Sequence, residues 1–423
     1  MKGREIKRST VLKNILVFLA GLLPPLLVVP GKVMHEYAFT LYREPKLYLI
    51  GALAWLLFTV GEAKNSAVAK GLMVLFFISL LSLSWAPVKE AVFYEAFQYI
   101  NLAVLASGLA YYFRQERARL LFLSGLLVSM AIAVFIGLCQ WKGIRFPQLF
   151  PVGIPYPSTF GARHSAGLAV CGTIFLTLAP LSYFLKKKRY IALLFLIVLF
   201  SLQLFYILIL GSRTSYFGIL MGGMATGVIG ARYFRFIPKK FIICGVLLLL
   251  LISGFAIPCI YKNDYIKDRL EKTVVFTKKP SLFLQTERWF WWSNSFQMLK
   301  ENPLGVGAGN WGFFYPVYRK YGKHVYFTEH TQVRRTHNDY LQLLCELGPL
   351  GVFILLFLLF KSLKWSWQLY EKNGSLEAAV LFVQLVAWTG LMCFDYPFEM
   401  PFQRFLLIMA MLLTEGIYNE SLA

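Results

Sequence analysis

The sequence has little charge, and negative charge is the scarcer kind. Asp, Glu, Lys and Arg make up only 15% of the 423 residues, whereas a soluble domain carries about a quarter. Hydrophobic residues make up 58%, and continuous apolar runs of about twenty residues recur along the whole chain. Such runs indicate helices that cross a bilayer rather than the alternating strands of a barrel. The composition therefore predicts an all-α polytopic membrane protein.

Motifs for disulfides and for metal ligation are also missing. None of the six cysteines has Cys-x-x-Cys spacing, which argues against a disulfide framework and against a zinc site. The spacing of His324, His330 and His337 matches no metal motif, and no His-Glu-x-x-His occurs. No Asp-x-Asp pair occurs either, which argues against a metal-dependent transferase that uses nucleotide sugars. We expect neither a metal ion nor another cofactor.

About twelve apolar runs are long enough to cross a bilayer core, and we predict a helix for each. The predicted spans are 12–29, 47–60, 67–85, 91–113, 120–141, 165–185, 190–210, 214–230, 241–260, 340–360, 376–394 and 402–417. Their interiors are nearly free of charge. Lys and Arg cluster on every second connection, at 2–13, 64–70, 114–119, 186–189, 232–240 and 361–372. Because cytoplasmic loops are rich in Lys and Arg, this pattern places both termini in the cytoplasm.

One connection is far longer than the others. Residues 261–337 form a predicted loop of over seventy residues on the outer side, well beyond an ordinary connection. We expect a partly helical cap there, between a bundle of nine helices at 1–260 and three helices at 338–423. The loop carries thirteen Lys and Arg against six Asp and Glu. Long translocated segments escape the positive-inside rule, so this charge indicates an anionic ligand on the outer face.

Three arginines on that side are candidate anion-binding residues. Arg163 follows a proline-rich stretch, and Arg213 lies in a tight turn between two spans. Arg288 begins a predicted amphipathic helix at 287–299, in which Trp291 falls on the same face. A guanidinium can grip phosphate oxygens while the Trp ring offers a platform to a sugar. The alternative is that each arginine anchors the chain to lipid headgroups.

His337 lies between the basic loop and the start of an apolar helix, with Asn338 or Asp339 as the predicted N-cap. Because a helix N-terminus attracts anions, His337 is either a structural helix-end histidine or a general base beside a phosphate. Asp395 lies between the last two spans, on the same predicted side. It is a candidate for orienting His337 or an arginine, and a purely structural ion pair is the alternative.

The stretch 302–311 reads Asn-Pro-Leu-Gly-Val-Gly-Ala-Gly-Asn-Trp and only partly matches a dinucleotide-binding loop. It lacks the last glycine of that pattern and follows no predicted strand, so we reject a nucleotide site. Tight turns, or a nest of backbone N–H groups around an anion, fit the stretch better.

Taken in order, these motifs resemble the signature of the bacterial O-antigen ligase/polymerase superfamily. The resemblance rests on His-Asn-x-Tyr-Leu-Gln-x-x-x-Glu-x-Gly-x-x-Gly from His337 onward and on the Gly-Ser-Arg turn at Arg213. It rests also on the Arg288-Trp helix with the glycine-rich loop after it, and on the Asp-Tyr-Pro turn at Asp395. It covers residues 160–401, and the first five predicted spans contain no motif.

The resemblance implies a metal-independent glycosyltransferase with a GT-C-like fold in the bacterial inner membrane and an active site on the periplasmic face. Such enzymes move a glycan from undecaprenyl diphosphate to an acceptor hydroxyl. By motif position His337 would be the catalytic histidine, and Arg213 and Arg288 would hold the diphosphate, with Arg163 as a third candidate. The supporting or sugar-contacting residues would be Asn338, Trp291 and Asp395.

Three acceptors are open within the superfamily. With lipid A–core as the acceptor, the protein would be an O-antigen ligase of lipopolysaccharide biosynthesis. With a growing O-antigen or exopolysaccharide chain it would be a polymerase, and with a protein Ser or Thr it would be an O-oligosaccharyltransferase. We favour the ligase because the Arg–Arg–His set is similar to that branch. A flippase for lipid-linked sugars would have charges at mid-membrane depth and repeated halves, and neither is evident. The expected partners are a lipid-linked glycan, an acceptor and membrane lipids, with no nucleic acid.

Overall fold

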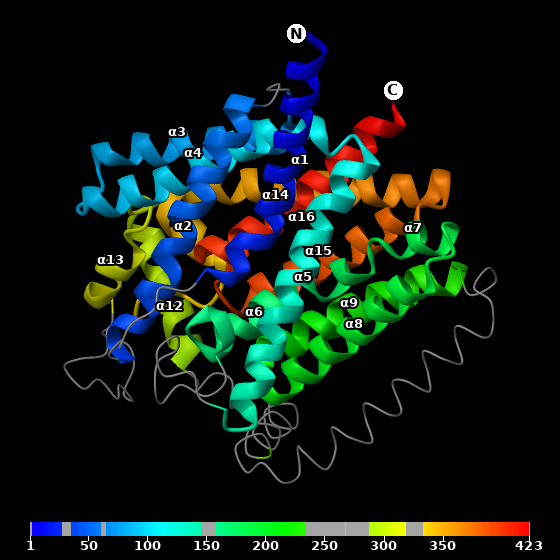
Figure 1. Cartoon of the computed structure of the whole chain (residues 1–423). Helices are drawn as coiled ribbons and strands as arrows, with labels where there is room; N and C mark the ends of the chain where they lie inside the picture. Colours follow the sequence, from blue (N-terminus) through cyan, green and yellow to red (C-terminus); the bar gives the residue numbers. More distant parts are fainter. Residues whose placement is uncertain are drawn as a thin grey trace.

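The computed structural model describes residues 2–27, 35–60, 65–144, 157–233, 267, 287–318 and 333–422. Every regular element within these ranges is a helix (Figure 1). The elements are α1 (Lys2–Leu26), α2 (His35–Val60), α3 (Ala67–Leu81), η1 (Ser82–Ser84), α4 (Lys89–Tyr112), α5 (Glu116–Trp141), η2 (Ser158–Phe160), α6 (Arg163–Ile174), η3 (Phe175–Leu178), α7 (Leu181–Lys186), α8 (Tyr190–Leu210), α9 (Arg213–Tyr233), α12 (Glu287–Glu301), α13 (Trp311–Tyr318), α14 (Asp339–Asn373), α15 (Leu376–Phe394), η6 (Pro397–Glu399) and α16 (Pro401–Ser421).

The all-α membrane architecture is confirmed. Six helical stretches of the described chain are long and apolar enough to cross a membrane, and each matches a predicted span. They are Ala67–Ser84, Glu116–Trp141, Arg163–Lys186, Tyr190–Leu210, Asp339–Asn373 and Leu376–Phe394. Five further predicted spans coincide with α1, α2, α4, α9 and α16. The predicted span at 241–260 lies outside the described residues, and the total of twelve stays a prediction.

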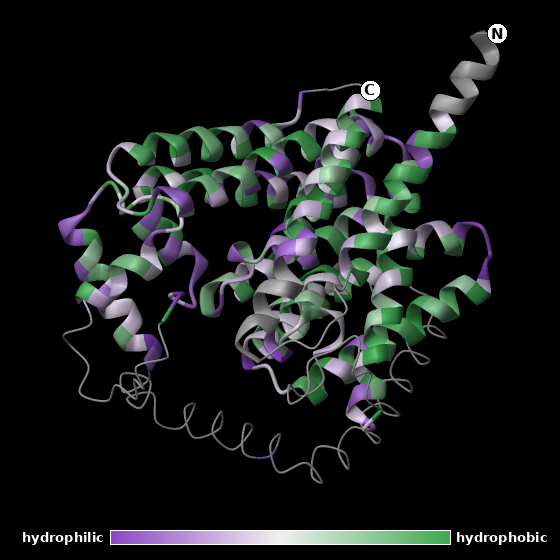
Figure 2. Ribbon diagram, turned by 60° about the vertical axis from the view of Figure 1, so that its left-hand side comes forward, coloured by the Kyte–Doolittle hydropathy of each residue, from purple (hydrophilic) through white to green (hydrophobic). Residues whose placement is uncertain are grey.

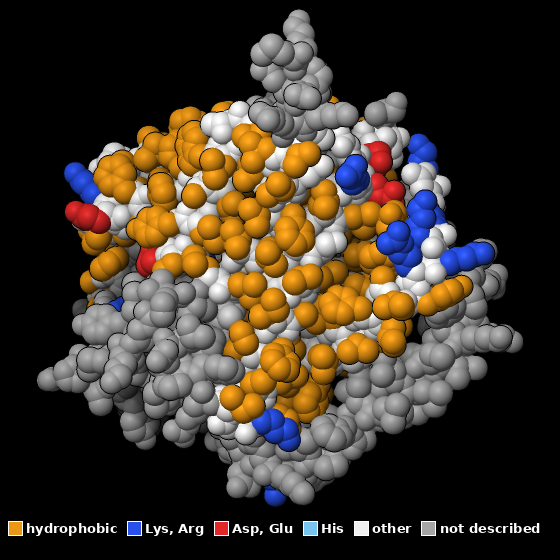
Figure 3. All heavy atoms as spheres, in the orientation of Figure 1, with side chains coloured by type: hydrophobic (Ala, Val, Ile, Leu, Met, Phe, Trp, Pro, Cys, Tyr) orange, Lys and Arg blue, Asp and Glu red, His pale blue; other side chains and the backbone are white. Residues whose placement is uncertain are grey.

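Hydrophobic residues run along most of each long helix (Figure 2), and apolar side chains cover much of the described surface in Figure 3. These exposed side chains, such as Phe77, Phe135 and Ile191, are those expected to face lipid. The helix α1 begins, and α16 ends, on one side of the molecule, whereas α12 and α13 lie away from that side (Figure 1). An even number of crossings would produce this arrangement of the two ends.

The centre of the bundle is α16. Every residue from Pro401 to Ile417 is buried, and the helix packs against α2, α3, α4, α6, α14 and α15. A helix that is enclosed on all sides must be apolar all round or have its polar groups paired. Its buried polar side chains are paired: Gln403 donates to the carbonyl of Ser165, Glu415 accepts from Ser66 and Ala67, and the partners of Arg404 are described below.

A kink divides α14 and creates the attachment point for the glycine-rich loop. Gly348 has a left-handed φ of 68°, and a Cβ there would lie 2.9 Å from the carbonyl oxygen of Leu304. Pro349 has no N–H, so the carbonyl four residues earlier loses its helical partner. That carbonyl, on Cys345, instead accepts a hydrogen bond of 2.8 Å from the N–H of Val306. The Gly-Pro pair therefore bends the helix and frees backbone acceptors for the incoming loop.

Candidate active site

The first turn of α14 places His337 at the helix entrance. Asn338 is the N-cap, as predicted, because its side-chain oxygen accepts a hydrogen bond of 2.9 Å from the N–H of Leu341. The Thr336 hydroxyl donates to the Asn338 carbonyl at 2.7 Å. Between them, His337 has a φ of 55°, which is uncommon for a residue with a side chain and costs about 1–3 kcal/mol. Hydrogen bonds of Thr336 and Asn338 hold the backbone on either side of His337.

Three side chains from two other elements surround this imidazole. Asp395, at the C-terminus of α15, has Oδ1 2.9 Å from Nδ1 of His337. Trp291 of α12 stacks on the ring with centroids 4.9 Å apart and an interplanar angle of 24°. Tyr396 meets the ring edge to face, at 4.7 Å and 82°. The structure thus brings the predicted residues His337, Asp395 and Trp291 into direct contact.

The charge of Asp395 determines how the imidazole is protonated. Burial alone would raise the pKa of Asp395, but the hydrogen bond to His337 and the charge of Arg288 hold that pKa below its usual range. An ionised carboxylate only accepts hydrogen bonds, so Nδ1 of His337 donates to it. Nε2 then carries the lone pair, and among the described residues it has no hydrogen-bond partner. This is the arrangement of a histidine that can accept a proton.

Each of the three candidate arginines lies at the start of a helix near His337 and Asp395. Arg288 lies one turn before Trp291 in α12, and its charge acts on Asp395. Arg213 is the first residue of α9, whose next residue, Thr214, donates a long hydrogen bond of 3.5 Å to the carbonyl of Phe394. That carbonyl immediately precedes Asp395, so the start of α9 lies beside the end of α15.

Arg163 begins α6. The next residue, His164, has its Nε2 2.7 Å from the hydroxyl of Tyr396. The start of α6 is therefore joined to the turn that contacts His337. All three arginines are half-buried, and all lie at the same end of the bundle as the histidine. Tyr396 was not among the predicted site residues, although its place beside Asp395 in the Asp-Tyr-Pro turn was the available signal.

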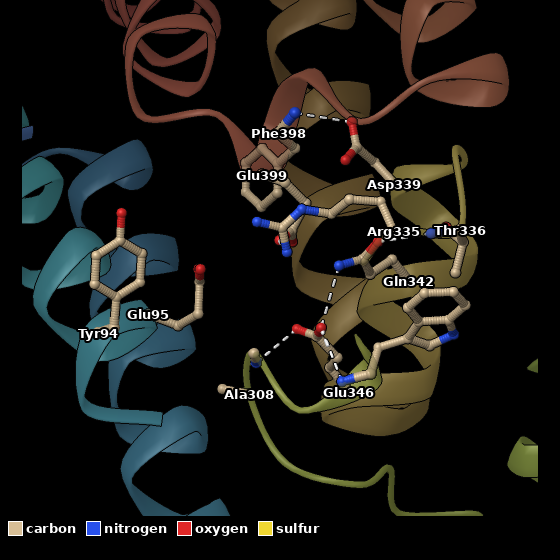
Figure 4. A network of polar contacts seen from close by, with 12 residues as sticks. Tyr94, Glu95, Ala308, Arg335, Thr336, Asp339, Gln342, Glu346, Phe398 and Glu399 are labelled. Atoms are coloured by element: carbon tan, nitrogen blue, oxygen red, sulfur yellow. Dashed lines mark hydrogen bonds and ion pairs between the residues drawn. The ribbon is translucent and has the colours of Figure 1, made fainter. Parts of the chain in front are cut away.

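A buried polar network joins the two segments that carry the site (Figure 4). Arg335 pairs with Glu399 at 2.9 Å, which joins the segment before His337 to the turn after Asp395. Burial alone would lower the pKa of Arg335, but the carboxylates of Glu399, Glu95 and Glu346 hold it above its usual value. The arginine therefore stays charged and holds the two segments together.

A second buried pair joins α16 to α4. Arg404 Nη2 lies 2.8 Å from Glu95 Oε2, and Arg404 Nε donates to the carbonyl of Phe398. The helices α4, α14 and α16 thus contain the buried residues Glu95, Glu346 and Arg404. Each of these residues is buried and lies within the first two turns of its helix, at the same end as the candidate site.

The glycine-rich loop forms the predicted nest, and the group that it holds is a carboxyl group of the chain itself. Gly309 donates its N–H to Oε2 of Glu346 at 2.8 Å, and Trp311 donates to Oε1 at 3.4 Å (Figure 4). Gly309 has a φ of 68°, and a Cβ there would lie 2.9 Å from the carbonyl oxygen of Ala91. The loop is thus a structural clamp between α4 and α14, and it leaves no role for a nucleotide.

Two further predicted site residues, Asn338 and Trp291, make contacts within the chain. The side chain of Asn338 is engaged in capping, and one face of Trp291 is covered by His337. His324 and His330 lie outside the described residues. The predicted division at 260 and 337 stays a prediction, although α12 and α13 show that the middle segment contains helices.

One known family is similar to part of this chain. The model of the family described as O-antigen ligase matches residues 195–356, which include Arg213, Arg288 and His337. Arg163 and Asp395 lie outside the matched range and reach the site only through the fold. No curated protein matches the chain. Residues 195–356 are thus similar to this family, which supports the resemblance to the O-antigen ligase/polymerase superfamily.

Proposed function

We propose that this protein is an O-antigen ligase-type glycosyltransferase. It moves a glycan from undecaprenyl diphosphate to a hydroxyl of an acceptor glycolipid, lipid A–core. The observation that carries the proposal is the His337–Asp395 hydrogen bond of 2.9 Å at the end of the bundle where three arginines begin their helices. A base oriented by a carboxylate, next to several guanidinium groups, suits a reaction in which a hydroxyl loses a proton and a diphosphate departs.

In the proposed reaction the acceptor oxygen attacks the anomeric carbon of the donor. Nε2 of His337 takes the proton of that hydroxyl, a C–O bond forms to the acceptor, and the C–O bond to the diphosphate breaks. Arg288, Arg213 and Arg163 stabilise the negative charge that develops on the leaving diphosphate. A single displacement inverts the anomeric configuration. No step needs a metal ion, because the guanidinium groups supply the positive charge.

The proposed location is the bacterial inner membrane, with both termini in the cytoplasm and the site on the periplasmic side. The alternation of basic connections supports this orientation, and so does the placement of both chain ends away from α12 (Figure 1). A flippase remains the alternative from another class. The buried charged residues of α4, α14 and α16 lie toward the ends of their helices rather than at mid-depth, with Glu95, Glu346 and Arg404 at one end and Glu415 toward the other. This placement favours the transferase.

The test is transfer in proteoliposomes that contain the purified full-length protein and an undecaprenyl-diphosphate-linked glycan. Lipid A–core, the free glycan repeat and a Ser/Thr-containing acceptor protein are supplied separately, all in EDTA. We expect an inverted glycosidic product on lipid A–core only. A product on the glycan repeat would identify a polymerase, and one on the protein an O-oligosaccharyltransferase. Movement of the donor across the bilayer without a covalent product would contradict the proposal and identify a flippase.

A further inference from the structure

Two residues outside the proposed catalytic set form a hydrogen-bonded pair against the imidazole of His337. The hydroxyl of Tyr396 and Nε2 of His164 are 2.7 Å apart, and their rings lie 5.4 Å apart at 60°. Tyr396 is 8% exposed and meets the His337 ring edge to face at 4.7 Å. The pair therefore connects α6, which begins with Arg163, to the imidazole at the entrance of α14.

We propose that Tyr396 and His164 act as positioning residues that hold His337 in its reactive orientation and align it with the start of α6. The inference rests on the proposed function, in which His337 is the base and Arg163 contacts the diphosphate. It gives a role to the buried phenol of Tyr396 and to His164, neither of which takes part in the proposed reaction itself.

The need for such a pair follows from the contacts of the imidazole. Trp291 covers one face, and Asp395 fixes Nδ1. One hydrogen bond and one stacked ring still allow the imidazole to slide in the plane of the Trp ring. An aromatic ring set at 82° to the imidazole blocks that movement. Asp395 also accepts from the N–H of Tyr396 at 3.2 Å, so both contacts come from one rigid turn.

The hydroxyl of Tyr396 determines whether the phenol stays in place. At neutral pH a phenol is protonated, so Tyr396 donates to Nε2 of a neutral His164. Without this bond the ring keeps its packing but loses the anchor to α6. A displacement of about 1 Å at a reacting group can cost about 10²-fold in rate. The hydrogen bond is therefore expected to affect kcat more than the affinity for the donor.

The experiment compares single-residue variants in the proteoliposome transfer assay. Tyr396→Phe removes only the hydroxyl, and His164→Ala removes its partner, whereas His164→Gln keeps a side chain that can accept the phenol hydrogen. Tyr340→Phe is the matched control, because Tyr340 donates to the Thr389 carbonyl at 3.4 Å and belongs to α14 without contacting the pair. Melting temperature in detergent is measured for every variant.

We expect Tyr396→Phe and His164→Ala each to lower kcat about 10- to 100-fold, with the KM for the donor within about twofold of the wild-type value. The double variant should be no slower than either single one, because both remove the same bond. His164→Gln should recover most of the rate, and Tyr340→Phe should behave as wild type.

Wild-type kcat in Tyr396→Phe, or fully additive losses in the double variant, would overturn the inference. A loss that follows the melting temperature and that His164→Gln does not recover would overturn it as well, because it would show a structural role alone. His337→Ala is measured in the same series. If His337→Ala is inactive while Tyr396→Phe is unaffected, the inference fails and the proposed function stands, whereas an active His337→Ala removes the proposed function itself.

Discussion

Replacing Asp395 with Asn removes the negative charge beside His337 with little change in the shape of the side chain. The carboxylate accepts from Nδ1 of His337 at 2.9 Å and from the N–H of Tyr396 at 3.2 Å. Asn has nearly the same volume, but one of its two polar atoms is a donor. When the Asn NH₂ faces His337, Nδ1 must accept, and the proton moves to Nε2. The imidazole can then no longer take a proton from the acceptor hydroxyl.

The size of the expected loss follows from what the carboxylate does. A positioned general base contributes about 10²- to 10⁴-fold to a rate, which corresponds to about 3–5 kcal/mol of the barrier. We expect Asp395→Asn to lose most of this contribution, which would appear as a lower kcat. The loss of stability should be smaller than the about 1.5–3 kcal/mol of a charged hydrogen bond, because Asn retains a neutral one.

The same substitution should also change how the stability of the protein depends on pH. The pKa of Asp395 is lower in the folded protein than in the unfolded chain, so its charge stabilises the fold above the unfolded pKa of about 4. That contribution is lost as the pH falls through the folded pKa. Asp395→Asn lacks it at every pH, so its melting temperature should fall less than that of the wild type between pH 6 and pH 3.

The assays are initial transfer rates from the lipid-linked donor and thermal unfolding of the purified protein in detergent. A variant with wild-type kcat would refute the assignment of Asp395 as the residue that fixes the His337 tautomer. An equal fall of the melting temperature with pH in variant and wild type would show that the carboxylate is not held ionised by the folded structure.

Three other predictions test separate parts of the structure. Arg288→Gln should lower kcat/KM for the donor about 10²- to 10³-fold without a change in melting temperature, and an unchanged donor kcat/KM would remove this arginine from the diphosphate site. Gly309→Ala should lower the free energy of unfolding by about 1–3 kcal/mol more than the control Gly143→Ala. Both glycines have a left-handed φ, but only at Gly309 would the added Cβ lie closer than 3 Å to a carbonyl oxygen. Equal losses of stability would contradict the role of the loop as a clamp. Arg404→Met should lower the free energy of unfolding by about 3–5 kcal/mol, and the double variant Arg404→Met/Glu95→Gln should lose clearly less. A double variant that is less stable than Arg404→Met would contradict a buried pair.

The parts of the fold that were predictable have local signals in the sequence. Apolar runs of bilayer length gave the positions of the long helices, and Asn338 followed by an apolar run indicated the start of α14. The Asp395–His337 contact was predicted as one of two alternatives because both residues fall at helix ends on the same predicted side. In each case the physical cause acts within a few residues or follows from the direction in which helices cross.

The rest depends on contacts between distant residues, which no local pattern specifies. His164 and Tyr396 are 232 positions apart, and only the packing of α6 against the end of α15 brings them together. The Gly348-Pro349 kink was visible in the sequence, but the loop that uses the freed Cys345 carbonyl begins some forty residues earlier. The nest was predicted without its acceptor, because a glycine pattern does not show that the Glu346 carboxyl group occupies it.

The transfer rate of His337→Ala tests the central claim most directly. We expect wild-type protein in proteoliposomes to transfer the glycan from undecaprenyl diphosphate to lipid A–core in EDTA. We expect His337→Ala to lose at least about 10²-fold in kcat, while its melting temperature and its KM for the donor stay close to the wild-type values. A variant that folds and transfers at the wild-type rate would contradict the claim that this histidine is the base.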